Sequence, residues 1–369
     1  MTTSELYIGL ISGTSVDGVD CALVDLKSEQ PQLVAAKTYP LPDDLRRFLL
    51  SLSKAQTHTL SDLGKANVVL GREFATAANS LLAETGKIKN DIVAIGSHGQ
   101  TIWHEPDSEF PFSWQLGDPN SIAEQTGITT VADLRSRDIA AGGQGAPLAP
   151  LLHQVVFASP AGNRAIINIG GISNLTWLPK AGPALAYDIG PGNLLMDYWI
   201  YKNKRMSYDQ DGQWATSGQV DQELLDILFA DDYFTRQPPK STGREHFNGP
   251  WLESKLTGLG RGLTPQDVQA TLLQLTAISI ANELNTRFPA TEVYVCGGGC
   301  QNKALMQTLQ QTAVDCAVHS TSTLGVDPDW VEAIAFAWMA QAAMENRTFD
   351  TRPFTGASRK LSLGAIYRA

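Results

Sequence analysis

The sequence predicts an α/β protein built from two duplicated domains. Its 369 residues exceed what one hydrophobic core usually organises. Two strand–turn–strand patterns with small polar residues at the bend lie far apart, over 6–25 and 164–177. Strands and helical patterns alternate along the rest of the chain, which is typical of α/β folds. The repeated hairpin therefore indicates a duplication.

The composition favours a folded globular protein and excludes several partners. The chain is 43% hydrophobic and 18% charged, which argues against disorder. A net charge of -10 without clustered lysine and arginine argues against a nucleic-acid partner. No apolar run reaches the roughly 18 residues of a membrane helix, and the start lacks a signal-peptide pattern. We therefore expect a cytoplasmic protein without a membrane partner and with four reduced cysteines. A homodimer is possible, because the sequence does not determine the oligomeric state.

The first hairpin, residues 6–25, carries a polar turn. Apolar runs flank this turn, and Gly18 permits a tight reversal of the chain. Backbone N–H groups, short hydroxyls and the carboxylates of Asp17 and Asp20 suit phosphate oxygens and a magnesium ion that keeps most of its waters. We expect Asp17 to contact this magnesium ion through a bound water molecule. An ordinary turn contains the same residue types, but the second hairpin favours phosphate binding.

Candidate substrate residues follow the next predicted strands. After a third strand (32–39) and a helix (59–85), a short strand (91–95) runs into His98 and Gln100. Polar residues at the carboxyl end of a strand in an α/β sheet usually line a ligand site. We therefore assign both residues to the substrate. A hydrogen-bonded structural histidine is the alternative for His98.

The segment 129–150 combines a cluster of charge with a loop rich in glycine and proline. Asp133 and Arg135 follow a short strand, and the planar fork of an arginine binds both oxygens of a carboxylate. We therefore expect a substrate role, although a flexible connector is the alternative. The domain boundary is placed here, with residues 1–130 plus about 346–369 in the first domain and residues 131–345 in the second.

Asp188 is the candidate catalytic residue of the second half. It lies at the end of a predicted strand (185–189), before a Gly-Pro-Gly turn and a helix that begins at Asn193. With an ordinary pKa of about 3.9, its carboxylate is ionised at neutral pH and fit to accept a proton. A helix-capping or turn-stabilising aspartate is the alternative.

Two later segments add candidate ligand contacts. The strand 292–296 is followed by three glycines and by a helix that begins near Asn302. This geometry suits a nucleotide, because glycine lets the ligand approach the backbone closely and the start of a helix favours negative charge. Glu332 lies near the start of a helix that runs to about residue 344. Its carboxylate either accepts hydrogen bonds from sugar hydroxyls or points to solvent. The tail, 362–367, has strand character and is expected to join the first domain.

A series of motifs resembles the anhydro-N-acetylmuramic acid kinase family and covers nearly the whole chain in the same order. These motifs are GTSVDGVD (13–20), GSHGQT (96–101), ADLRSRDIAAGGQGAPL (132–148), INIGGISN (167–174), YDIGPGN (187–193), TGREHF (242–247), CGGGCQN (296–302) and PDWVEAIAFA (328–337). One departure is Ile189, where the family pattern leads us to expect threonine. The missing hydroxyl puts a phosphate contact from residue 189 in doubt.

The resemblance implies two ribonuclease H-like domains around an ATP cleft, the fold of sugar kinases, Hsp70 and actin. It also implies a kinase of cell-wall recycling that uses ATP and Mg²⁺. Water attacks the anomeric carbon of 1,6-anhydro-N-acetylmuramic acid, Asp188 accepts the proton of that water, and O6 takes the γ-phosphoryl group. The products are N-acetylmuramic acid 6-phosphate and ADP.

Two sets of binding residues complete the expected site. The ATP-binding set comprises Gly13, Thr14, Ser15, Val16, Asp17, Gly18, Val19, Asp20, Gly170, Gly171, Asn174, Gly190, Gly297, Gly298, Gly299 and Asn302. The substrate-binding set comprises His98, Gln100, Asp133, Arg135 and Glu332.

Two other functions compete with this one. In an ordinary sugar kinase of the same fold, Asp188 would deprotonate a substrate hydroxyl instead of water. An ATP-driven conformational protein of the actin or Hsp70 type would need no small substrate, but the chain has no peptide-binding module after the second domain.

Overall fold

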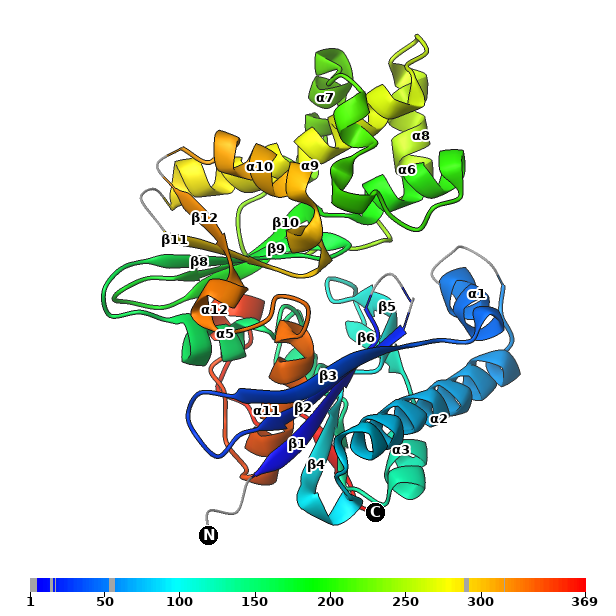
Figure 1. Ribbon diagram of the computed structural model, residues 1–369, viewed down its shortest axis with the longest axis vertical. Helices are drawn as coiled ribbons and strands as arrows, with labels where there is room; N and C mark the ends of the chain where they lie inside the picture. The colour runs from blue at the N-terminus through cyan, green and yellow to red at the C-terminus, as the bar shows by residue number, and fades with distance from the viewer. Residues whose placement is uncertain (1–4, 14–15, 17, 53–56, 289–291, 315) are drawn as a thin grey trace. The chain divides into compact units, whose positions relative to one another are not determined.

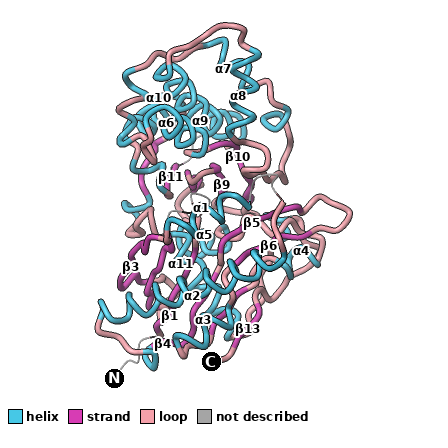
Figure 2. Tube along the Cα trace, turned by 90° about the vertical axis from the view of Figure 1, so that its right-hand side faces the viewer, coloured by secondary structure: helices cyan, strands magenta, loops and turns pink. Residues whose placement is uncertain are grey.

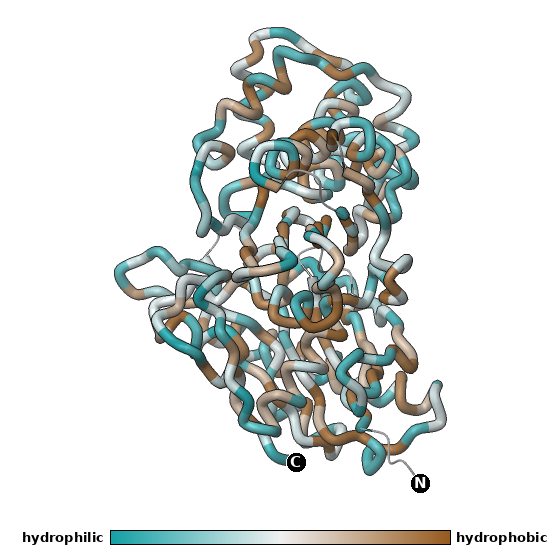
Figure 3. The backbone as a smooth tube through the Cα atoms, turned by 90° about the vertical axis from the view of Figure 1, so that its left-hand side faces the viewer, coloured by the Kyte–Doolittle hydropathy of each residue, from teal (hydrophilic) through white to brown (hydrophobic). Residues whose placement is uncertain are grey.

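A computed structural model describes residues 5–13, 16, 18–52, 57–288, 292–314 and 316–369. The chain divides into two compact units. Unit 1 comprises Met1–Val156 and Trp330–Ala369, and unit 2 comprises Phe157–Asp329. Each unit has its own sheet, helices and hydrophobic core (Figure 1). Hydrophobic chain, brown in Figure 3, runs through the interior of each unit, and hydrophilic chain gathers in outer loops.

Unit 1 is built on the sheet that begins with the first predicted hairpin. Its strands are β1 (Leu6–Ile11), β2 (Gly18–Asp25), β3 (Gln32–Pro40), β4 (Ile92–Ser97), β5 (Gln100–Glu105), β6 (Phe112–Leu116), β7 (Thr130–Ala132) and β13 (Ala365–Tyr367). Its helices are α1 (Asp43–Leu52), α2 (Leu60–Thr85), α3 (Pro119–Thr126), α4 (Ser136–Ala140), α5 (Pro150–Phe157), α11 (Val331–Met344) and α12 (Arg352–Thr355). The sheet order is β13-β7-β4-β1-β2-β3, and β5 pairs with β6 in a separate hairpin.

Helices cover both faces of the unit 1 sheet. Side chains alternate along a strand, so Ile8 and Leu10 of β1 join the core formed with α2. Figure 2 shows α2 and α11 beside the strands of this sheet. Gly9 points to the other face, where a Cβ atom would lie 1.8 Å from the carbonyl oxygen of Ala333 in α11. Gly96 of β4 meets α11 in the same way, with 2.0 Å to the carbonyl oxygen of Phe336. The two glycines therefore let α11 lie directly on the sheet.

Unit 2 repeats this topology. Its strands are β8 (Arg164–Ile169), β9 (Ile172–Leu178), β10 (Leu185–Pro191), β11 (Glu292–Cys296) and β12 (Ala317–Ser320). Its helices are α6 (Leu194–Lys204), α7 (Gln222–Phe229), α8 (Gly249–Gly258), α9 (Pro265–Arg287) and α10 (Lys303–Thr312). The sheet order is β10-β9-β8-β11-β12, with β8, β9 and β10 antiparallel and β11 and β12 parallel to β8.

The two sheets share one plan, which confirms the predicted duplication. In unit 1, β1, β2 and β3 form the antiparallel meander, and β4 and β7 add in parallel on the other side of β1. Three antiparallel strands followed by two parallel ones is the ribonuclease H-like arrangement that the family resemblance implied. The predicted return of the tail is also confirmed, because β13 pairs with β7.

The limits of the units differ from the predicted domain edges at 130 and 345. The glycine-rich part of 129–150 is no connector, because the buried Asp138 carboxylate accepts hydrogen bonds from Gly145 N–H at 2.8 Å and from Thr355 Oγ1 at 2.9 Å. The helix α11 belongs to unit 1, because it packs on β1 and β4. The divisions therefore fall after Val156 and after Asp329.

Candidate active site

The turn of the first hairpin lies between β1 and β2, as predicted, with Ile11 paired to Asp20. Thr14, Ser15 and Asp17 lie outside the described residues. Val16 is buried and has a φ angle of 53°, an unusual conformation for a β-branched residue. Its N–H group donates to the Gly13 carbonyl at 3.1 Å. The described part of the turn is therefore tightly folded.

The base of this turn is held by β3. A Cβ atom at Gly18 would lie 2.6 Å from Thr38 Cγ2, so glycine is required by close packing. The Thr38 hydroxyl donates to Asp20 Oδ1 at 2.6 Å. Val19 points into the core of unit 1, so only its backbone is available to a phosphate.

Polar side chains gather where β1 and β4 end. The Ser12 and Ser97 hydroxyls and the Gln100 Oε1 atom are buried, and none of them has a hydrogen-bond partner among the residues that the structure describes. The Ser12 N–H group faces the Gly99 carbonyl at 3.4 Å, which brings this corner together. Because buried polar atoms are normally paired, these three atoms are suited to contacts with a ligand.

His98 and Arg135 form a contact between the end of β4 and the segment before α4. The His98 Nε2 atom receives hydrogen bonds from Arg135 Nε at 3.0 Å and Nη2 at 2.8 Å. The other ring nitrogen lies 3.0 Å from the Gly99 carbonyl. Burial, with the neighbouring guanidinium as the next cause, lowers the pKa of His98 to about 3. The imidazole is therefore neutral at physiological pH.

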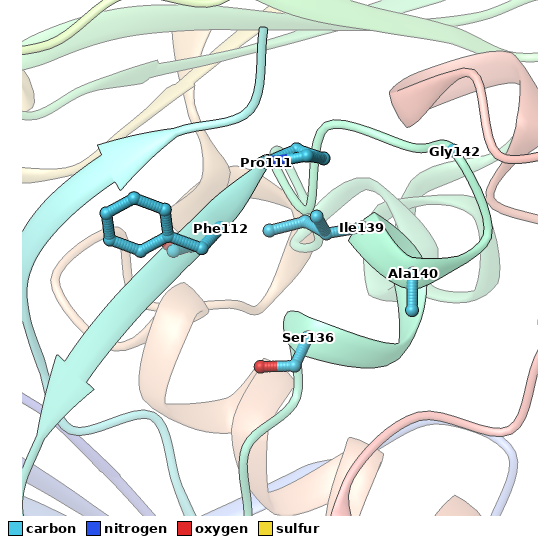
Figure 4. Close-up of a pocket in the computed structure, with 7 residues that line it drawn as sticks. Pro111, Phe112, Ser136, Ile139, Ala140 and Gly142 are labelled. Atoms are coloured by element: carbon cyan, nitrogen blue, oxygen red, sulfur yellow. The ribbon is translucent and has the colours of Figure 1, made fainter. Parts of the chain in front are cut away.

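A pocket of about 360 Å³ lies between the start of β6 and α4. Its lining comprises Pro111, Phe112, Ser113, Ser136, Ile139, Ala140 and Gly142 (Figure 4). Ser136 follows Arg135 in the chain, and its hydroxyl donates to the carboxylate of the exposed Asp133. The volume lies in the range of small-molecule sites, roughly 300–1,000 Å³. Neither Asp133 nor Arg135 lines this pocket, and the Asp133 side chain contacts a lining residue through the Ser136 hydroxyl.

Glu332 lies in the first turn of α11 and is half-buried. The next residue, Ala333, packs against Gly9 of β1. Glu332 thus belongs to unit 1, together with the other predicted substrate residues.

In unit 2, two glycine turns meet at the carboxyl ends of β8 and β11. The Gly170 and Gly171 carbonyls accept hydrogen bonds from the N–H groups of 192–194, at 2.8 to 3.1 Å, and so hold the start of α6. A Cβ atom at Gly297 would lie 2.2 Å from the Asn168 side chain, and one at Gly299 would lie 2.3 Å from Ile169. The absence of side chains here allows the two turns to touch.

The two asparagines predicted to bind ATP lie in different elements near these turns, Asn302 at the start of a helix and Asn174 within a strand. The Asn302 Oδ1 atom accepts from Leu305 N–H at 3.0 Å and caps α10, as its position before a helix predicts. Asn174 lies on β9, where it pairs with Asn168 on one side and with Asp188 on the other. Gly298 has open space around it apart from the Asn193 amide.

Asp188 lies at an irregularity in the β10–β9 pairing. Asp188 pairs with Asn174 and Gly190 with Ser173, so Ile189 has no opposite residue and the ladder contains a bulge. Ile189 is 1% exposed and packs in the core of unit 2. The Asp188 side chain is half-buried. Bulges of this kind redirect side chains and are common beside active sites.

The Asp188 carboxylate and backbone are held by residues that sequence reasoning missed. Asp188 Oδ2 accepts a hydrogen bond from Thr242 N–H at 3.0 Å. The Asp188 N–H group donates to the Lys240 carbonyl at 3.1 Å, and its carbonyl accepts from Tyr233 Oη at 2.7 Å. Burial raises the pKa of Tyr233, and the nearby Asp188 carboxylate acts in the same direction, so the phenol keeps the proton that it donates.

The Lys240 side chain is anchored in α9. Its Nζ atom lies 3.2 Å from Glu283 Oε1, and both side chains are largely buried. Burial lowers the pKa of Lys240, and Glu283 opposes this effect. Glu283 also accepts from Tyr187 Oη at 2.7 Å and from Arg287 Nε at 2.8 Å. The only sequence signal for these contacts was the TGREHF motif, because the partners lie far apart in the chain.

Two absences hold for the described residues alone. Within 5–13, 16, 18–52, 57–288, 292–314 and 316–369, no three His, Cys, Asp or Glu side chains group so as to hold a metal ion. Over the same ranges, no helix combines the length and the apolar character needed to cross a membrane.

The chain is similar to known kinases over its whole length. The family model described as anhydro-N-acetylmuramic acid kinase matches residues 5–369. The anhydro-N-acetylmuramic acid kinase of Vibrio vulnificus strain YJ016 is 47% identical, covering 100% of this chain and 99% of the relative. The one from Shewanella frigidimarina is 48% identical over 100% of both chains, and the one from Xylella fastidiosa is 47% identical over 99% of this chain and 97% of its own. The chain therefore belongs to the anhydro-N-acetylmuramic acid kinase family.

Proposed function

We propose that this protein is an ATP-dependent kinase that opens 1,6-anhydro-N-acetylmuramic acid with water and phosphorylates O6. The products are N-acetylmuramic acid 6-phosphate and ADP, in the recycling of peptidoglycan. Family membership supports the substrate and the use of ATP. The observation that carries the mechanism is the Asp188 carboxylate, which lies at a strand bulge and is oriented by the Thr242 N–H group.

The two bond changes share one oxygen atom. Water forms a bond to the anomeric carbon and gives its proton to Asp188, while the bond between that carbon and O6 breaks. The released O6 attacks the γ-phosphorus, and the bond between this phosphorus and ADP breaks. Because O6 leaves the carbon as a nascent alkoxide, one base serves both steps and no separate acid is needed.

The glycine turns are the proposed sites of the nucleotide. Residues 13–20 in unit 1 would bind ATP phosphates, and in unit 2 the turns at 170–171 and 297–299, with Asn174, Gly190 and Asn302, would contact the nucleotide. The open space beside Gly298 supports this assignment, because a glycine without near neighbours lets a ligand approach the backbone. A cytoplasmic location would supply the ATP.

The proposed protein ligands of magnesium are the carboxylates of the first turn, so the nucleotide phosphates and water would have to supply most of the ligands. A kinase Mg²⁺ usually has one or two protein carboxylates, with the remaining places taken by phosphates and water. Asp17 is the proposed contact through water, and Asp20 is the other carboxylate in the sequence of this turn. When bound, the ion would neutralise phosphate charge during transfer.

The first test replaces the proposed base. We expect Asp188→Asn to lower turnover by about 10²–10⁴-fold, because an amide cannot accept the proton, and to leave ATP affinity within about twofold. Turnover is measured by ADP release with the anhydro sugar, and ATP affinity by calorimetry. Asp226→Asn, at an exposed position of α7, is the matched control. An Asp188→Asn enzyme that keeps most of its rate would contradict the mechanism.

Oxygen-18 water separates this reaction from the two alternatives. A phosphorylated sugar with one heavy oxygen at the anomeric position establishes water attack and phosphorylation together. Phosphorylation without label indicates an ordinary sugar kinase in which Asp188 deprotonates a hydroxyl. ATP hydrolysis that needs no sugar indicates a conformational ATPase.

A further inference from the structure

The hydrogen bonds of His98 determine which of its ring nitrogens carries the proton. Nδ1 faces the Gly99 carbonyl at 3.0 Å, and a carbonyl oxygen can only accept. Nε2 faces Arg135 Nε at 3.0 Å and Nη2 at 2.8 Å, and a guanidinium can only donate. His98 is therefore protonated on Nδ1, and its bare Nε2 accepts both Arg135 groups.

The imidazole itself is held rigidly. His98 is 8% exposed, and its ring packs on Phe336 of α11 with 4.7 Å between centroids and 33° between planes. The His98 N–H group of the backbone donates to the Leu10 carbonyl at 2.9 Å, which ties the residue to β1. An acceptor fixed in this way fixes the plane of the guanidinium that it binds.

Arg135 is held from a second side. Its Nη1 atom donates to the Gly145 carbonyl at 2.8 Å, and the Gly145 N–H group donates to the buried Asp138 carboxylate at 2.8 Å. His98 and Gly145 thus contact all three nitrogens of the guanidinium. A long arginine side chain otherwise samples many rotamers, and immobilising it on binding costs free energy.

We propose that His98 is the positioning residue that orients the Arg135 guanidinium toward the carboxylate of the substrate, and is not itself a substrate ligand. A sugar hydroxyl could bond His98 only by displacing Arg135 or the Gly99 carbonyl. The inference rests on the proposed function and on the prediction that Arg135 pairs with the carboxylate of the substrate's lactyl group. The neutral state of the buried ring agrees with an acceptor role.

Two amide variants of His98 test this inference as a matched pair. In His98→Gln, the terminal oxygen lies near the Nε2 position and can accept from Arg135. In His98→Asn, the shorter amide can still reach Gly99 but leaves Arg135 without its acceptor. We expect His98→Asn to raise KM for the anhydro sugar about 10–100-fold, from the loss of hydrogen bonds to a charged group, and His98→Gln to stay within about threefold of wild type. KM for ATP should change by less than about twofold in both.

A sugar without the carboxylate provides the decisive comparison. Binding of 1,6-anhydro-N-acetylglucosamine, which lacks the lactyl group, should be equal in wild type and His98→Asn when measured by calorimetry. Equal losses for both sugars would make His98 a general structural residue and overturn the inference. So would a His98→Gln variant that is as impaired as His98→Asn.

Arg135→Lys separates a failure of this inference from a failure of the proposed function. A raised sugar KM in Arg135→Lys, with an unchanged KM in His98→Asn, overturns the positioning role and leaves the role of Arg135 intact. An unchanged sugar KM in Arg135→Lys overturns the pairing of Arg135 with the carboxylate, and the inference falls with it. Product analysis in oxygen-18 water still tests the reaction itself in that case.

Discussion

Residue 189 shows how one side chain of the predicted catalytic motif packs in the hydrophobic core. Ile189 lies between Asp188 and Gly190, where the family pattern leads us to expect a threonine hydroxyl. The bulge in β10 turns Ile189 into the core of unit 2, and the side chain is 1% exposed. A hydroxyl at this position would be buried among apolar side chains, so no phosphate contact is lost with isoleucine.

We expect Ile189→Thr to lower the free energy of unfolding by about 1–3 kcal/mol, because it removes a methyl group and buries a hydroxyl. KM for ATP should stay unchanged. Ile189→Val is the control for lost volume alone, at about 0.5–1.5 kcal/mol. Urea denaturation measures the first quantity and steady-state kinetics the second. A lower KM for ATP in Ile189→Thr would show that residue 189 does reach the nucleotide.

The sequence predicted a catalytic role for Asp188 but none of the groups that hold it. A strand that ends in an acidic residue before Gly-Pro-Gly is a local pattern, and such patterns survive in a single sequence. The contact with Thr242 joins residues 54 positions apart, and Tyr233 reaches Asp188 across 45 positions. Neither the periodicity of apolar residues nor the spacing within a motif predicts a contact between residues so far apart in the sequence.

At the scale of elements, α11 depends on two glycines of the sheet beneath it. A Cβ atom would lie 1.8 Å from backbone at Gly9 and 2.0 Å at Gly96, and backbone of a buried helix cannot move aside cheaply. We expect Gly9→Ala to destabilise unit 1 by more than about 3 kcal/mol, measured by thermal and urea denaturation.

Gly64 is the control for this prediction. It lies inside α2, and a Cβ atom there would meet nothing within 4 Å. Gly64→Ala should stabilise the protein by about 0.5–1 kcal/mol, because alanine favours the helix and restricts the unfolded chain. Similar effects from both alanine substitutions would refute the close approach of α11 to the sheet.

Elements with local signals were predicted well, and α11 shows what local signals leave out. Thr59 and Gly86 cap the two ends of α2, and Thr264 caps the start of α9 with Pro265 at its first position, so local residue types account for these ends. In α11 nearly every residue is buried, so no apolar stripe indicates which sheet it covers. The helix was therefore assigned to the wrong domain from sequence, although its existence was predicted.

At the scale of the whole molecule, buried neutral histidines make the fold sensitive to acid. Burial lowers the pKa of both His98 and His153 to about 3, whereas an unfolded histidine has a pKa of about 6.5. Between these values the unfolded chain binds protons that the folded chain does not. Stability is therefore lost progressively as pH falls from about 6.5 toward about 3.

When the pH falls from 7 to 5, we expect the free energy of unfolding to decrease by about 2 kcal/mol for each of these two histidines. Urea denaturation at the two pH values measures the loss. His153→Leu, which cannot titrate, should shrink the difference by about 2 kcal/mol. An identical pH difference in wild type and His153→Leu would exclude His153 as a source of the acid sensitivity.

Unit 1 is made of two separate stretches of chain, with unit 2 inserted between them. During synthesis on the ribosome, all of unit 2 emerges before α11 and β13 do. At roughly 5–20 residues per second, the start of unit 1 waits on the order of 10–40 s for these last elements. Until then the face of the sheet over β1 and β4 lacks α11, and β7 lacks its edge strand β13. The half of the protein made first is therefore the half completed last.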